Sequence, residues 1–178
     1  MQRRQFLSAL AAGAATLAIP GVAQSQSFWE YPRTLWLKRA QTGEESKVVY
    51  WANGQYNPDG YRQACVMLRD VKANLTVTMD PVLLDILRGI QGWFEGAGIH
   101  RPIIINSGYR SPKTNSNLEG AARNSMHLHG KAADLWLPDV PSEYLARLAL
   151  YLQGGGVGVY TGKGFVHVDS GRLRAWRG

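Results

Sequence analysis

The ten residues from Ser125 to Asp134, Ser-Met-His-Leu-His-Gly-Lys-Ala-Ala-Asp, constrain this chain more than any other stretch. Asp134 lies within the apolar run Ala-Ala-Asp-Leu-Trp-Leu, which is typical of a buried strand. A carboxylate is costly to bury unless a cation or strong hydrogen bonds compensate its charge. A metal ion held jointly with His127 would supply that compensation.

A second histidine occurs in the same kind of setting, in the apolar run Phe165–Asp169. Side chains alternate between the two faces of a strand, so Asp134 and His167 can meet if their strands are neighbours. His127 lies where the chain enters its strand and can fold over the same point. Two imidazoles and one carboxylate suit zinc, and three protein ligands leave a fourth position open for water.

Each of these residues also has a structural interpretation. A lone histidine in a strand is more often a packed, hydrogen-bonded core residue, and Asp134 could instead pair with an arginine or a lysine. The combination of the three residues, with Gly130 allowing close backbone approach, favours the metal. Zinc with an open position activates water and polarises a carbonyl, so amide hydrolysis is the coherent reaction class.

The N-terminus has the pattern of an export signal. Arg3-Arg4-Gln5-Phe6-Leu7 is a twin-arginine signature, followed by a soft apolar run over residues 9–19. An N-terminal membrane anchor is the alternative, but this run is too short to span ~30 Å of hydrocarbon. We therefore expect residues 1–25 to be a twin-arginine signal peptide, residues 26–178 to form one domain, and the mature protein to be periplasmic.

Composition narrows the possible partners. Removing residues 1–25 lowers the formal net charge from +7 to +5, which suits either an anionic polymer such as the cell wall or ordinary surface charge. The sequence has no run of basic residues, so nucleic acid is not expected as a binding partner. After residue 25 no apolar run approaches the ~18 residues of a transmembrane helix. Cys65 is alone, so we expect no disulfide framework and a small buried side chain within a helix. We expect a monomer.

Periodicity and punctuation predict an α+β fold in which helices pack on an antiparallel sheet that carries the zinc site. Asn57-Pro58 and Asp80-Pro81 are helix starts, and the second helix runs from Val82 to about Ala97. A long polar loop, Ser107–Ser125, separates two buried strands; loops of that length are usually functional or mobile. The expected strands are residues 34–40, 47–51, 102–106, 131–137, 157–160 and 165–169, and a further helix covers 141–153.

Three motifs resemble those of a known group. Ser-x-His-x-x-Gly-x-Ala-x-Asp, at Ser125–Asp134, resembles the first zinc motif of the D-Ala-D-Ala carboxypeptidase, lysostaphin and hedgehog-type zinc peptidases. Ser107–Ser111 is similar to the Ser-Gly-Tyr-Arg-Ser segment of that group. Residues 155–160 and 165–171, followed by Arg174-x-Trp176, resemble the murein endopeptidase K-like branch. The similarity runs from about residue 33 to the C-terminus.

The resemblance implies a hedgehog/D-Ala-D-Ala peptidase-like fold and roles for particular residues. His127, Asp134 and His167 would hold one Zn²⁺ per chain, and the substrate would be peptidoglycan stem or cross-link peptides. Arg110 would bind a substrate carboxylate, for which its bidentate geometry is suited, with a structural salt bridge as the alternative. Tyr109 and Ser125 would be lesser residues of the site wall.

The general base is not assigned by the pattern. Many members of the wider group place an acid or a histidine two or three residues before the last ligand, where this chain has Phe165 and Gly164. Asp169 is our candidate, either as base or as a group that orients His167, and His129 is a weaker alternative. Three functions stay open: a cross-link-cleaving endopeptidase, a D-alanyl carboxypeptidase, and a non-catalytic zinc-stabilised wall-binding module.

Overall fold

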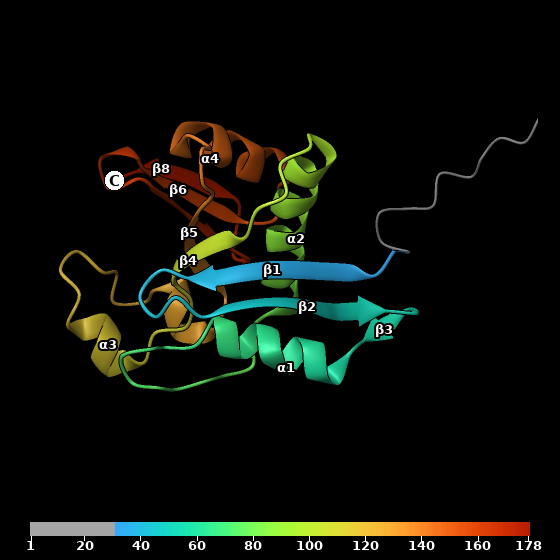
Figure 1. The fold of residues 1–178 in the computed structure, drawn as a ribbon. Coiled ribbons are helices and arrows are strands. Elements are labelled where there is room, and N and C mark those ends of the chain that lie inside the picture. Colours follow the sequence, from blue (N-terminus) through green and yellow to red (C-terminus); the bar gives the residue numbers. More distant parts are fainter. Residues whose placement is uncertain (1–30) are drawn as a thin grey trace, which may run out of the picture.

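The computed structural model describes residues 31–178, so the predicted signal peptide lies outside the described residues. One eight-stranded sheet has the order β3-β2-β1-β4-β5-β7-β6-β8 (Figure 1). Its strands are β1 (Arg33–Arg39), β2 (Glu45–Ala52), β3 (Gln55–Tyr56), β4 (Ile103–Ser107), β5 (Ala132–Trp136), β6 (Gly156–Tyr160), β7 (Phe165–Asp169) and β8 (Arg174–Arg177). The helices are α1 (Pro58–Met67), α2 (Pro81–Gly96), α3 (Pro112–Ser116) and α4 (Ser142–Tyr151), with short 3-10 turns η1 (Met126–His129) and η2 (Thr161–Lys163).

The α+β class is confirmed, and the sheet is mostly antiparallel as expected, but two of its strand pairs are parallel. β1 pairs with β4, and β6 with β8, in parallel. Parallel neighbours need a crossover connection, and the chain between β1 and β4 supplies one that contains both α1 and α2. β8 was not predicted, since its four residues carry two arginines and it is stabilised mainly by pairing with β6.

Both predicted helix starts are confirmed. The Asn57 side chain accepts hydrogen bonds from the backbone N–H groups of Asp59 and Gly60, and Asp80 accepts one from that of Val82. The polar loop before the zinc motif differs from the prediction, because it contains the five-residue helix α3. Ser111 caps α3 in the same way, with a proline next in sequence. The same cap-then-proline signal was therefore present in this loop.

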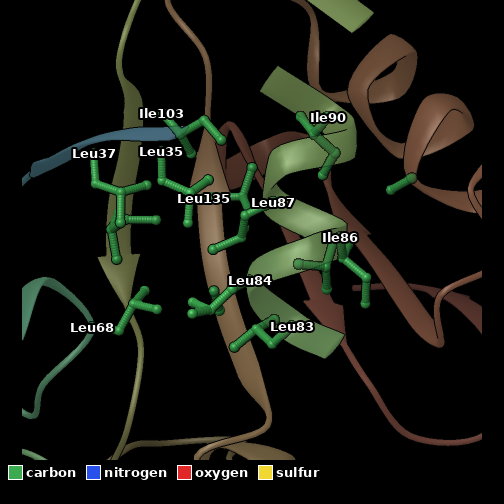
Figure 2. Close-up of a cluster of buried hydrophobic side chains, with 14 of the residues drawn as sticks. Leu35, Leu37, Leu68, Leu83, Leu84, Ile86, Leu87, Ile90, Ile103 and Leu135 are labelled. Atoms are coloured by element: carbon green, nitrogen blue, oxygen red, sulfur yellow. The ribbon is translucent and has the colours of Figure 1, made fainter. Parts of the chain in front are cut away.

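One face of the sheet carries the hydrophobic core. Alternate residues of β1, β4, β5, β6 and β7 pack there against α1, α2 and α4, and Cys65 of α1 is buried among them as predicted. Figure 2 shows Leu84 and Leu87 pointing from α2 towards the strands that carry Leu135 and Leu35. In the part of the chain that is described, no helix is long and apolar enough to cross a bilayer.

The intervening residues of the central strands point to the opposite face. Asp134 of β5 lies directly across from His167 of β7, as expected for neighbouring strands, and across from Ser107 of β4. The β4–β5 pairing is irregular between Ile105 and Ser107, which brings Ser107 onto the same face as Asp134. This polar face is covered by the segment from β4 to β5, which includes α3 and lies apart from α2 and α4 (Figure 1).

We expect Leu84→Ala to lower the free energy of unfolding by about 2–5 kcal/mol, because it leaves a cavity in the fully buried core beneath the sheet. Val82→Ala, in the same helix but 49% exposed, is the matched control and should change it by less than about 0.5 kcal/mol. Urea unfolding followed by circular dichroism measures both. Equal losses in the two variants would show that α2 does not anchor the core.

Candidate metal centre

Three side chains from separate segments converge on the polar face of the sheet. His127 comes from η1, Asp134 from β5 and His167 from β7, and none is more than 7% exposed. His127 Nε2 lies 3.2 Å from Asp134 Oδ1 and 3.1 Å from His167 Nδ1, and the last two atoms are 2.9 Å apart. The predicted grouping is therefore present in the structure.

A backbone carbonyl determines which nitrogen of His127 is available. His127 Nδ1 lies 2.6 Å from the oxygen of Gly108, which can only accept a hydrogen bond, so Nδ1 carries the proton and Nε2 keeps its lone pair. The backbone at Gly108 packs closely against Leu68, and a Cβ added at Gly108 would lie 2.1 Å from the Leu68 carbonyl oxygen. The next residue, Tyr109, donates its backbone N–H to that oxygen at 2.7 Å, which holds this segment in place. Gly108 follows β4 directly, so the sheet itself orients this imidazole.

Asp169 performs the same task for His167 from the opposite side of the ring. His167 Nε2 donates to Asp169 Oδ2 at 2.9 Å, which leaves Nδ1 free to face Asp134. Asp169 is fully buried and also accepts two hydrogen bonds from Arg174, at 3.0 and 2.6 Å, and others from the backbone N–H groups of Gly171 and Gly156. Both oxygens of this carboxylate therefore accept hydrogen bonds from the protein.

Arg110 holds the other oxygen of the shared carboxylate. Its Nη2 bonds Asp134 Oδ2, and its Nε donates to Ser107 Oγ at 2.8 Å. Asp134 therefore offers Oδ1 to the two histidines and Oδ2 to the arginine. The salt bridge that was the alternative role for Arg110 is present.

The four buried groups differ in how their protonation equilibria shift. Burial lowers the pKa of His127, and Asp134 opposes this only in part. Burial also acts to lower the pKa of His167, but the hydrogen bonds of its ring to the carboxylates of Asp134 and Asp169 outweigh this effect and raise the pKa. Burial acts to raise the pKa of Asp134, but the attraction of His127 and His167 is stronger and holds this pKa well below its usual range. Burial likewise acts to raise the pKa of Asp169, but the hydrogen bonds from His167 and Arg174 outweigh it and lower this pKa below its usual range.

This donor set fits a zinc ion. Ligand atoms around a tetrahedral zinc, with bonds of about 2.0–2.1 Å, lie about 3.3–3.4 Å from one another. The three atoms here are separated by 2.9–3.2 Å, so a point near the centre of the triangle, slightly out of its plane, lies within bonding distance of all three. Each histidine also has the orienting partner that metal-binding histidines usually have.

The three side chains form part of the wall of a cavity of about 780 Å³. Its other walls come from the segment 118–126, from Tyr160, Lys163 and Phe165, and from Arg174 and Trp176 of β8. A cavity of this size and polarity is suited to a peptide or ligand of several residues. The three residues therefore line a space that a substrate can enter.

Glycines in β6 make room for the β8 wall. A Cβ at Gly156 would lie 2.3 Å from Arg174 Nη1, and one at Gly158 would lie 2.4 Å from the indole of Trp176. Gly158 is paired with His167 on one side and with Trp176 on the other. The Trp176 indole occupies the space where a side chain at residue 158 would lie, and it packs near the His167 imidazole, with ring centroids 5.2 Å apart.

The remaining residues predicted from the sequence lie in different places. Ser125 is buried at the cavity wall, and its hydroxyl accepts a hydrogen bond from the His127 N–H at 3.4 Å. Tyr109 lines a neighbouring cavity and packs against the core. His129 is exposed, contacts Asn124 at 3.0 Å, and does not line the cavity of the three ligand residues.

Two charged residues of this cavity were not singled out in the sequence. Glu119 lies in the segment after α3, and Lys163 lies in η2 between β6 and β7. Neither falls in a strand or an amphipathic helix, so periodicity carries no signal for it. The length of the polar loop was the one sequence feature that pointed towards Glu119.

Comparison with known proteins agrees with this geometry. The family described as Peptidoglycan L,D-endopeptidase MepK matches residues 28–176. The Peptidoglycan L,D-endopeptidase MepK of Escherichia coli K12 is 34% identical over 180 residues, covering 98% of this chain and 96% of that protein. The Probable peptidoglycan L,D-endopeptidase MepK of Haemophilus influenzae is 33% identical over 152 residues, covering 83% of this chain and 80% of that protein.

We expect Asp169→Asn to weaken zinc binding by about 10–100-fold, because it removes the charge that orients and polarises His167. Competition against a chromophoric chelator measures the dissociation constant. Asp59→Asn, on the exposed side of α1 with 86% of its side chain accessible, is the control and should bind zinc as the wild type does. Wild-type affinity in Asp169→Asn would contradict the orienting role.

Proposed function

Because the chain belongs to the peptidoglycan L,D-endopeptidase MepK family, we propose that it hydrolyses an amide bond in peptidoglycan cross-link peptides with the help of one zinc ion. The observation that carries this proposal is the convergence of three buried ligand atoms on the wall of a peptide-sized cavity. The expected hedgehog/D-Ala-D-Ala peptidase-like architecture belongs to the same proposal.

His127, Asp134 and His167 would hold the zinc, through Nε2, Oδ1 and Nδ1 respectively. A zinc ion bound there would polarise a substrate carbonyl and lower the pKa of water towards ~7. The chain's own contribution is orientation. Gly108 holds one imidazole, and Asp169 with Arg174 holds the other, so each ring presents its remaining nitrogen to the position that the zinc would take.

Arg110 would have two tasks. Its Nε and Nη2 are bonded to Ser107 and Asp134, and Nη1 has no partner among residues 31–178. Since Arg110 lines the cavity, Nη1 can bind a substrate carboxylate or carbonyl oxygen beside the scissile bond. Ser125 would support the site through His127, and Tyr109 would line its approach.

Glu119 is the residue that we propose for proton transfer. A base must be unengaged and within reach of the reacting water. Asp169 is enclosed by four donor groups on the far side of His167, and His129 lies outside the cavity. Glu119 lines the cavity, is exposed, and has no hydrogen bond or ion pair within the described part of the chain. Asp169 then acts as the orienting group of the two roles expected for it.

The alternatives receive less support. A wall-binding module would need no free carboxylate beside its metal, whereas Glu119 provides one. A D-alanyl carboxypeptidase needs a cleft that is closed on one side of the metal, whereas a second cavity adjoins this one. We further propose that residues 1–25 direct a monomeric domain, residues 26–178, to the periplasm by the twin-arginine route. N-terminal sequencing of the protein recovered from the periplasm tests the cleavage.

Purified protein should convert cross-linked muropeptide dimers into monomers. We expect a zinc chelator to abolish this activity and added zinc to restore it, and His127→Ala to lower both bound zinc and turnover by more than about 100-fold, because a ligand is lost. His100→Ala, which changes an exposed histidine away from the cavity, is the control. Mass spectrometry identifies the products. Loss of a single terminal alanine, with dimers left intact, would exclude the endopeptidase.

Glu119→Gln should lower kcat by about 10²–10⁴-fold while zinc content and the circular dichroism spectrum stay unchanged, because only proton transfer is removed. Glu45→Gln, on the exposed end of β2, is the matched control. Steady-state kinetics on the cross-linked dimer gives kcat and KM separately. A Glu119→Gln variant with wild-type kcat would eliminate this residue as the base.

A further inference from the structure

We propose that the cavity adjoining the metal centre binds the second arm of the cross-linked substrate, and that Lys72 binds a carboxylate on that arm. The inference rests on the proposed function and specifies its substrate: a peptide with two arms, each carrying a free carboxylate. It assigns a binding site to residues on the far side of Arg110, distant in sequence from the zinc motif.

The two cavities adjoin each other. The second has a volume of about 340 Å³ and shares four lining residues with the first: Arg110, Leu118, Asp134 and Phe165. Asp134 is itself one of the three proposed ligands, so the boundary between the cavities lies at the metal centre. A peptide that extends from one cavity into the other would pass the scissile position at this boundary.

Most charges in the second cavity are already paired. Arg69 forms an ion pair with Glu44 at 2.8 Å. The carboxylate of Asp70 accepts hydrogen bonds from the backbone N–H groups of Ser111, at 2.8 Å, and Ala73, at 3.1 Å. Arg110 is bonded to Asp134. These pairs shape the cavity and leave little charge for a ligand.

Two cations remain. Arg39 is only 2% exposed: its Nη1 donates to the carbonyls of Met67 and Arg69, its Nη2 donates to Gln41 Oε1, and its Nε is buried out of reach of a ligand, with no hydrogen-bond partner among the described residues. Lys72 is exposed and has no acidic partner within residues 31–178. The free amine of Lys72 is therefore the group with which a substrate carboxylate in this cavity can form an ion pair.

The first cavity offers a corresponding cation. Lys163 is exposed, makes no ion pair within residues 31–178, and lies 5.8 Å from the centre of the Tyr160 ring. Each of the two adjoining cavities thus has one exposed lysine that makes no ion pair within residues 31–178. A carboxypeptidase needs a carboxylate site on one side only, because its substrate ends there. One such site in each of the two adjoining cavities matches a cross-linked substrate.

The test uses the purified protein and a synthetic cross-linked dimer with a free carboxylate on each arm, together with two analogues, each amidated on one arm. Hydrolysis gives kcat and KM, and calorimetry with the metal-depleted protein gives Kd. Lys72→Gln should raise KM and Kd for the dimer about tenfold, the size expected for one charge-assisted hydrogen bond at a partly open site, and leave kcat within about twofold. Lys47→Gln, on β2 and outside both cavities, should leave all three unchanged.

Amidation identifies the arm. One analogue should bind the wild type about tenfold more weakly, and that penalty should disappear in Lys72→Gln; the other analogue should lose affinity equally in both proteins. Unchanged KM and Kd in Lys72→Gln, with the wild type cleaving the dimer, would overturn this inference and leave the proposed function standing. A Lys72-dependent Kd without hydrolysis would support the cleft and refute the proposed function. Dimers that neither bind nor react would overturn both.

Discussion

The ionised carboxylate of Asp134, buried in the middle of the sheet, is the constraint on which the rest of the site depends. An isolated charge there would cost several kcal/mol, and the protein compensates it with Arg110 on one oxygen and two imidazoles on the other. Each imidazole is held in turn, His127 by a backbone carbonyl and His167 by Asp169. The result is a chain of oriented donors and acceptors that leaves three lone pairs directed at one point, which is the arrangement a zinc ion requires.

The sheet separates stability from chemistry by its two faces. Leucine, isoleucine and valine side chains on one face pack against α1, α2 and α4, which makes the central strands a rigid platform. The other face can then carry polar groups whose positions are determined by strand register. Gly156 and Gly158 extend this principle, because the absence of their side chains lets Arg174 and Trp176 of β8 reach Asp169 and His167. A mobile support could not hold these contacts within the tolerance that metal binding needs.

The loop segments provide what the strands do not. The region between β4 and β5 places Glu119 in the wall of the cavity that the three ligand residues line, and η2 places Lys163 in the same wall. In the adjoining cavity, Lys72 provides an exposed positive charge without an ion pair among the described residues. Two adjoining cavities that each carry such a lysine suit an internal bond of an anionic, branched peptide better than a chain end. Family membership, metal geometry and cleft shape thus support the same reaction class from independent observations.

The sequence alone predicted the six longer strands, the capped starts of α1 and α2 and the three candidate ligand residues, because alternation along a strand places Asp134 and His167 on definite faces whichever way the strands pair. Only the tertiary structure decided which groups those residues meet. It assigned Asp169 to the far nitrogen of His167, placed His129 outside the cavity and Arg110 against Asp134, and added β8, the parallel pairs and α3. Contacts of this kind join residues far apart in the chain, and local periodicity contains no information about which distant segments pack together.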